Sequence, residues 1–176
     1  DPAQNTFLNP PVPECGVAFA GTDEFTGKTR KDLHPQTFFY HTDDRLKPYL
    51  KNTDYLSAQV YLSTLEGGYH FLTLVIAIAS KNAPLEYGGI EKGSVLSFKM
   101  LGGETAKVQA NKTDNGLYDP RTDTFVYRIQ YLISGGVKKI LEDELIDQIR
   151  LTWSRGYEDY NIYEVDVLQR QFACLK

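Results

Sequence analysis

The sequence lacks most signatures of a recognisable activity, and each absence excludes a class of protein. It has no G-x-S-x-G motif, no P-loop and no cysteine placed as a nucleophile. No apolar run approaches the roughly 20 residues that a membrane-spanning helix needs. The 176 residues include 19 basic and 23 acidic side chains, a formal charge of −4, with both signs interspersed along the chain. Binding nucleic acid requires a basic face, so nucleic acid is not an expected partner.

Histidines and carboxylates also show no pattern typical of a metal centre or an acid–base pair. His34 and His41 lie seven positions apart across a proline, and His70 shares a strand face with apolar residues, which predicts a partly buried imidazole. The adjoining carboxylates 142–144 point in different directions on a helix and are typical of a solvated end. The sequence therefore predicts no metal ligand and no catalytic residue. Carboxylates that meet only in the folded chain stay an open alternative.

Only two cysteines are present, Cys15 and Cys174, close to opposite ends of the sequence. The termini of one domain often lie near each other, so we expect a disulfide between them, with two separate buried thiols as the alternative. A bridge would indicate an oxidising, extracytoplasmic location, whether periplasmic, cell-surface or secreted. Residues 1–14 hold four of the eight prolines, which predicts an extended leader. Such a segment would suit a lipid tether upstream of Asp1.

Short amphipathic segments fill the rest of the chain and favour a β-rich fold. Residues 69–80 form a run without charge, glycine or proline, and their β-branched content predicts a strand buried on both faces. Residues 55–65 alternate between apolar and polar side chains, and Gly67-Gly68 predicts a hairpin between the two strands. Together with seven similar segments, these two give eight or nine predicted strands in sequential hairpins; the other segments are 24–33, 36–42, 94–101, 104–110, 125–133, 145–154 and 156–167.

Two or three short helices accompany these strands. Helical spacing predicts one over about 137–143, and residues 167–175 suit a short amphipathic helix or a capped tail. A third is predicted to begin at Thr42. Strands do not alternate with long helices, which excludes a doubly wound parallel sheet. We therefore predict a mainly β fold, an antiparallel β-sandwich or open barrel, with residues 15–176 as a single domain.

An aromatic cluster on the predicted 145–167 hairpin is the best candidate binding surface. Aromatic rings that keep one polar edge stack on sugar faces or anchor protein partners, and Tyr, Trp and Arg are enriched at such sites. The alternative is structural, since alternate residues of the hairpin line the core and the others form cross-strand pairs. The candidate ligand-binding residues are Trp153, Arg155, Tyr157, Tyr160 and Tyr163, with Glu158 among them.

The loop 111–123 carries oxygen donors at spacings that partly resemble a calcium-binding loop. With Gly116 as the sixth position, the loop lacks an acidic first ligand and has Thr122 where a bidentate glutamate is needed. Turn formation alone explains its asparagines and aspartates. Calcium therefore stays a weakly supported alternative, and no other cofactor is indicated.

Together these observations predict a secreted or surface-tethered, non-enzymatic domain that binds a protein or a glycan. Two alternatives remain: a small hydrolase whose acid and base are brought together only by the fold, and a lipocalin-like carrier of an apolar ligand. The fold distinguishes the three. A carrier needs a large internal cavity, a hydrolase needs a cleft holding facing carboxylates or a histidine, and an interaction domain needs an aromatic patch.

Overall fold

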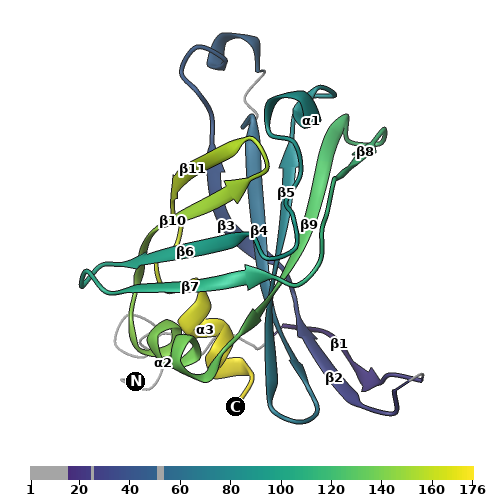
Figure 1. Ribbon diagram of the computed structural model, residues 1–176, viewed down its shortest axis with the longest axis vertical. Helices are drawn as coiled ribbons and strands as arrows, with labels where there is room; N and C mark the ends of the chain where they lie inside the picture. The colour runs from purple at the N-terminus through teal and green to yellow at the C-terminus, as the bar shows by residue number, and fades with distance from the viewer. Residues whose placement is uncertain (1–15, 25, 51–53) are drawn as a thin grey trace, which may run out of the picture.

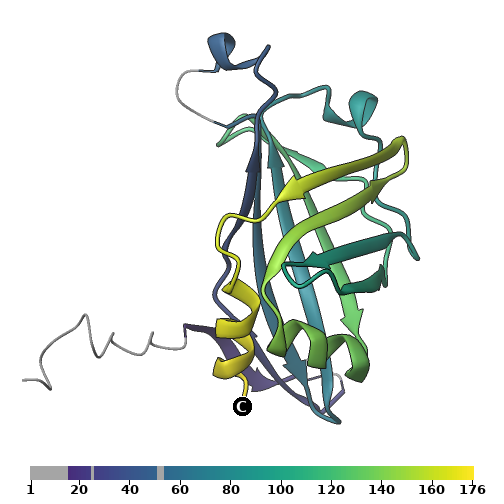
Figure 2. The ribbon, with the colours of Figure 1, turned by 90° about the vertical axis from the view of Figure 1, so that its left-hand side faces the viewer.

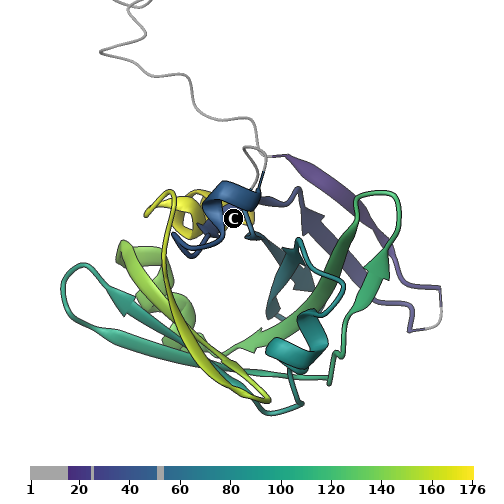
Figure 3. The same ribbon diagram turned by 90° about the horizontal axis from the view of Figure 1, so that it is seen from above.

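The computed structural model describes residues 16–24, 26–50 and 54–176. Eleven strands, all paired antiparallel, form one open and strongly curved sheet with three short α-helices, which confirms the mainly β prediction. Seen from above, the strands of the curved sheet are arranged as an incomplete ring (Figure 3). The strands are β1 (Val17–Thr22), β2 (Thr29–Leu33), β3 (Gln36–His41), β4 (Leu56–Leu65), β5 (Tyr69–Ile78), β6 (Val95–Met100), β7 (Thr105–Ala110), β8 (Leu117–Asp119), β9 (Thr124–Ile133), β10 (Ile146–Trp153) and β11 (Gly156–Asn161).

The helices lie at the two ends of this curved sheet. They are α1 (Ala83–Glu86), α2 (Gly135–Asp143) and α3 (Val167–Cys174), with a 3-10 turn η2 (Lys47–Tyr49). The helices α2 and α3 pack side by side at the lower end, whereas α1 and the β3–β4 connection lie at the upper end (Figures 1 and 2). The hairpin of β1 and β2 extends away from the rest of the sheet (Figure 1). No helix in the described ranges is long and apolar enough to cross a membrane.

The predicted hairpin of β4 and β5 is confirmed and forms the centre of the sheet. Its strands pair from Leu56↔Ile78 to Leu65↔Tyr69, around a turn that contains two glycines with positive φ. The inward face of β5 is fully buried, whereas most of its outward face is only half-buried. Burial of β5 is therefore less complete than predicted, because the sheet curls around one interior and turns its other face outward.

Aromatic and aliphatic side chains fill the interior of the curved sheet. Rings from β3, β6, β9, β11 and α3 account for the largest fully buried side chains: Phe38, Phe39, Phe98, Tyr127, Tyr131, Tyr160 and Phe172. β3, which pairs with β4, approaches the last strand β11 where Phe39 stacks on Tyr160, with ring centroids 4.4 Å apart. The Tyr163 amide also donates to the Phe38 carbonyl over 2.8 Å. The sheet thus forms an open barrel whose two sides are joined here by packing of the Phe39 and Tyr160 rings.

One edge of β4 is shared by two strands and a helix side chain. β3 pairs with Leu56–Val60, and β2 pairs with Ser63–Leu65. Between them, Gln171 of α3 accepts a hydrogen bond from the Leu62 amide (2.8 Å) and donates one to the Val60 carbonyl (3.0 Å). Its side chain is only 2% exposed. Gln171 therefore replaces a strand partner and fastens α3 to the sheet.

Local structure differs from the sequence predictions in several places. The loop 111–123 contains a short strand, β8, which pairs with β9. Thr42 does not begin a helix: only the turn η2 forms in this segment, and its N-cap is Leu46. The α1 segment, expected as loop, makes one helical turn. The predicted leader 1–14 and the predicted disulfide partner Cys15 lie outside the described residues, so both stay predictions.

Candidate functional site

A pocket of about 420 Å³ lies at the upper end of the barrel, opposite α2 and α3. A smaller pocket of about 80 Å³ adjoins it and shares Glu86, Tyr87 and Glu158 with it. We call the larger one the mouth pocket. Its lining comes from the end of β3, the β3–β4 connection, the end of α1 and β11: His41, Asp43, Arg45, Leu46, Tyr55, Glu86, Tyr87 and Glu158.

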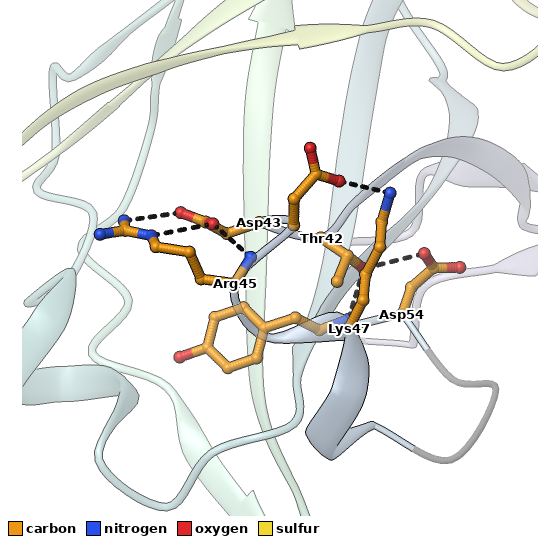
Figure 4. A network of polar contacts seen from close by, with 7 residues as sticks. Thr42, Asp43, Arg45, Lys47 and Asp54 are labelled. Atoms are coloured by element: carbon orange, nitrogen blue, oxygen red, sulfur yellow. Dashed lines mark hydrogen bonds and ion pairs between the residues drawn. The ribbon is translucent and has the colours of Figure 1, made fainter.

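The β3–β4 connection forms one rim of the mouth pocket and is held together at its base by Thr42. The Tyr55 amide donates to Thr42 Oγ1 (2.9 Å), and the Thr42 hydroxyl donates to Asp54 Oδ1 (2.9 Å) (Figure 4). These bonds bring the end of β3 next to the start of β4. His41, the last residue of β3, and Tyr55, which immediately precedes β4, consequently line the same pocket.

Asp43 on this rim is neutralised by its neighbour Arg45. The Arg45 guanidinium donates to both carboxylate oxygens, over 3.1 Å and 2.8 Å, and its amide donates as well (Figure 4). These hydrogen bonds lower the pKa of Asp43 to about 2. Lys47 pairs in the same way with Asp44 on the outside of the turn. The carboxylate of Asp43 is therefore already satisfied within the loop.

Glu86 at the end of α1 receives a hydrogen bond from a neutral tyrosine. The Tyr55 hydroxyl donates to Glu86 Oε2. Burial, followed by this bond, raises the pKa of Tyr55 to about 12, so the hydroxyl keeps its proton at neutral pH. Glu86 itself is exposed at the pocket and acts here as an acceptor.

Glu158 on β11 is held by a chain of hydrogen bonds that begins in the core. Trp153 Nε1 donates to the Tyr160 hydroxyl (3.4 Å), and this hydroxyl donates to Glu158 Oε2 (2.6 Å). Burial, followed by the contact with Glu158, raises the pKa of Tyr160. The core thereby fixes the position of one carboxylate at the surface.

Tyr87 lies between the two glutamates. Its ring packs on Trp153 with centroids 4.9 Å apart. Burial raises the pKa of Tyr87, and the charges of Glu158 and Glu86 raise it further. Across the described part of the chain, neither glutamate forms an ion pair with a lysine or arginine. The mouth pocket thus presents two carboxylates beside a tyrosine, with only neutral hydrogen-bond donors supporting them.

The loop after α1 is fastened to the β10–β11 turn, which fixes the two glutamates relative to each other. The Ser154 amide donates to the Gly89 carbonyl over 2.8 Å, and the Gly89 amide donates to the Ser154 hydroxyl over 3.0 Å. The Tyr127 hydroxyl donates to the Gly88 carbonyl over 2.7 Å. Gly88 has a φ of +76°, and a Cβ there would lie 1.9 Å from Ser154 Oγ. Only glycine suits this position without rearrangement.

Replacing Gly88 with alanine is expected to lower the free energy of unfolding by about 1–3 kcal/mol, because strain at positive φ adds to the clash with Ser154. Urea unfolding measures this loss. Gly136→Ala is the matched control, since Gly136 lies in α2 and a Cβ there would meet nothing within 4 Å. Equal stabilities of the two variants would contradict the proposed fastening of the loop.

The structure separates the five predicted binding residues into three environments. Trp153, Arg155 and Tyr157 line the smaller pocket, although Trp153 is only 3% exposed. Tyr160 is buried beneath Glu158. Tyr163 lies apart from the pocket residues, 63% exposed, with its ring edge-on to Tyr40 at 5.6 Å. The set does not form one continuous surface.

Sequence reasoning missed most of the mouth pocket. His41 was weighed only as a metal ligand, Asp43 falls in the predicted helix start, and Glu86 lies in a predicted loop. These residues are far apart in the chain and share no spacing that indicates a common site. Glu158 stood within the predicted aromatic cluster, which is the one signal that pointed to this region.

The loop 111–123, for which calcium was a weakly supported alternative, uses its oxygens internally. Asp114 Oδ1 accepts the Gly116 amide (2.7 Å), and Asp119 pairs with the Arg121 guanidinium. Within the described ranges, no three histidine, cysteine, aspartate or glutamate side chains are grouped so that they could hold a metal ion. The residues present in this loop do not fit calcium.

A function for this chain is inferred from these contacts, because no relative provides one. No protein-family model, no curated protein and no solved structure matches this chain.

Proposed function

We propose that the chain is an extracytoplasmic, non-enzymatic binding domain that takes a glycan into the mouth pocket. The observation that carries this proposal is the pocket itself, where Glu86, Tyr87 and Glu158 line one cavity at the upper end of the barrel. Its volume of about 420 Å³ falls within the range typical of small-ligand sites.

The chemistry of the lining suits a carbohydrate. Sugar hydroxyls donate hydrogen bonds to carboxylates, and the C–H faces of sugar rings pack on aromatic side chains. The smaller pocket extends the lining with Arg155 and with Tyr157, whose side chain is 61% exposed. The two pockets together therefore suit a ligand longer than one sugar unit. A protein partner would more often use a flat patch, so it ranks second as a ligand class.

The extracytoplasmic part of the proposal depends on the predicted disulfide. A bridge between Cys15 and Cys174 would persist only in an oxidising compartment. Intact mass before and after reduction and alkylation tests the bridge directly.

A small hydrolase is the second candidate, because the mouth pocket brings together His41, Glu86 and Glu158. Glycoside hydrolysis needs one protonated and one ionised carboxyl group. In this pocket both glutamates accept hydrogen bonds from tyrosine hydroxyls, which suits two ionised acceptors and favours binding. New reducing ends on oligosaccharides, lost in Glu158→Gln, would support the hydrolase instead. A carrier of apolar ligands would need an empty interior, but buried side chains occupy the interior.

An array of neutral, acidic and amino oligosaccharides tests the proposal. The variant Glu86→Gln/Glu158→Gln keeps the shape of the pocket and removes its charge. We expect its affinity for the bound glycans to fall about 10- to 100-fold, the range for losing hydrogen bonds to charged groups. The control Glu24→Gln/Glu104→Gln makes the same change of net charge on exposed residues outside the lining. It should bind like the wild type.

Two results would contradict the glycan proposal. A wild-type protein that binds nothing on the array would shift the assignment to a protein partner. Binding that survives unchanged in the double glutamine variant would place the ligand site outside the mouth pocket.

A further inference from the structure

The strand β1 forms one margin of the sheet and leaves one of its two edges unpaired. It pairs with β2, and among the described residues no other backbone group hydrogen-bonds to Val17–Thr22. All six residues of β1 are exposed, and Phe19 is 48% exposed. The hairpin of β1 and β2 lies on the outside of the molecule and extends away from the barrel (Figures 1 and 3). The edge of β1 is therefore accessible to another strand.

The other strands at the margins of the sheet are protected against such pairing. β8 is only three residues long and contains Asp119, and β11 contains Glu158 and Asp159. β3 lies against β11, and its Phe38 carbonyl accepts the Tyr163 amide. Short edges, charged side chains and a covering element are the usual means by which edge strands avoid other chains. β1 has the sequence VAFAGT, which contains no charged residue and no proline.

The charge of β1 favours a second copy of the same chain as its partner. A charged side chain brought into a new strand pair would lose hydration without meeting an opposite charge on β1. The pairing strand should therefore be uncharged and should have a free edge of its own. Among the described strands, β1 combines these two properties, so β1 of a second copy meets both requirements.

Symmetry favours the same partner. Antiparallel pairing of β1 with its own copy is related by a two-fold axis, so one contact occupies the free edge of both chains. The remaining margins are charged or covered, and the assembly closes at two copies. A register shift between Val17 and Phe19 limits the regular part of the edge to Phe19–Thr22. A contact this short buries less than the roughly 1,600 Å² of a standard interface, which corresponds to weak association.

We propose that two copies of the chain associate through antiparallel pairing of their β1 strands, which joins the two sheets into one continuous sheet. The two-fold axis lies within Phe19–Thr22. The dissociation constant should be about 10 µM to 1 mM, the range for a small and transient interface. The dimer does not depend on glycan binding, so its test and the test of the mouth pocket are independent.

Sedimentation equilibrium of the full chain over about 5 µM to 2 mM measures the association. We expect the average mass to rise with concentration from that of one chain toward twice that value. The variant Ala20→Glu places one carboxylate from each copy near the two-fold axis, where like charges repel. It should raise the dissociation constant at least about 10-fold. The single chain should tolerate this change, because Ala20 is exposed and lies opposite Lys31 of β2.

Leu132→Glu is the matched control for the added charge. Leu132 is 45% exposed on β9, where it is paired on both sides, with Phe71 and with Gln109. This variant should associate like the wild type. If Leu132→Glu weakened association as much as Ala20→Glu, the contact would lie on the outer face of the sheet and the proposal would be overturned.

Amide hydrogen exchange at low and at high protein concentration identifies the pairing strand without any substitution. Amides within Phe19–Thr22 that face away from β2 should exchange at least about 2-fold more slowly at the high concentration. Amides of β8 and β11 should exchange equally at both. Slower exchange confined to another strand would overturn the proposal, and so would association that is unchanged in Ala20→Glu. A mass of one chain at every concentration would also overturn it and leave the edge to an extended peptide of another protein.

Discussion

Replacing Trp153 with alanine is expected to lower the free energy of unfolding by about 3–5 kcal/mol, the range for deleting a large buried ring. Trp153 is 3% exposed and packs against Tyr87 and Tyr127, with ring centroids 4.9 and 5.1 Å away. Its Nε1 also donates to Tyr160, which in turn supports Glu158. The substitution therefore leaves a cavity in the core and removes the first link of the chain that positions a carboxylate in the pocket.

Urea denaturation gives this loss directly, and two further variants keep the measurement interpretable. Trp153→Phe retains a ring and removes the N–H donor, so we expect a smaller loss of about 1–2 kcal/mol. Tyr157→Ala removes a ring of the same hairpin that is 61% exposed and should cost less than about 1 kcal/mol. If Trp153→Ala were no less stable than Tyr157→Ala, the assignment of Trp153 to the core would be wrong.

Gln171→Ala is expected to lower the free energy of unfolding by about 2–4 kcal/mol, because it leaves two buried backbone groups without partners at about 1–3 kcal/mol each. The groups are the Leu62 amide and the Val60 carbonyl, which the Gln171 side chain now satisfies. Among the described residues no strand pairs with β4 at Leu62 on this edge, so no neighbouring strand replaces the lost side chain.

Amide hydrogen exchange at Leu62 provides a local readout of the same substitution. We expect exchange at this amide to accelerate in Gln171→Ala more than at amides elsewhere in β4. Gln169→Ala is the matched control, since Gln169 lies two positions away in α3 and is only half-buried. Unchanged exchange at Leu62 in Gln171→Ala would show that the side chain does not act as a strand partner.

The β4–β5 hairpin could be predicted from the sequence because its local signals agree. Alternating apolar residues in 55–65, a β-branched run after them and Gly67-Gly68 between them all favour the same structure. The structure adds only the pairing register and the ring of strands around the hairpin.

Strand β10 shows where local periodicity stops being sufficient. Strict alternation over 145–154 puts Leu145 on the same face as Ile149 and Trp153. In the structure Ile146 faces inward instead and is 1% exposed, because the pairing with β6 shifts register between Ile146 and Gln148. An irregularity of this kind depends on the partner strand, so the sequence of β10 does not predict it.

The mouth pocket could not be predicted, for a related reason. Its acidic residues come from a loop, a one-turn helix and a strand whose positions are set by long-range contacts, such as those between Gly89 and Ser154. The aromatic cluster on the hairpin could be recognised in the sequence, but its rings differ in burial. Trp153 and Tyr160 serve the core, and Tyr157 remains at the surface.

The most direct test of the central claim is an amide chemical-shift titration of the isotope-labelled full chain with the oligosaccharide that binds most tightly on the array. If the mouth pocket is the ligand site, saturable shifts should concentrate at Glu86, Tyr87 and Glu158 and along the rim 41–46. The same titration of Glu86→Gln/Glu158→Gln should show these shifts greatly reduced. Shifts confined to other surfaces, such as the loop 111–123, would contradict the assignment of the pocket, and so would a spectrum that does not change.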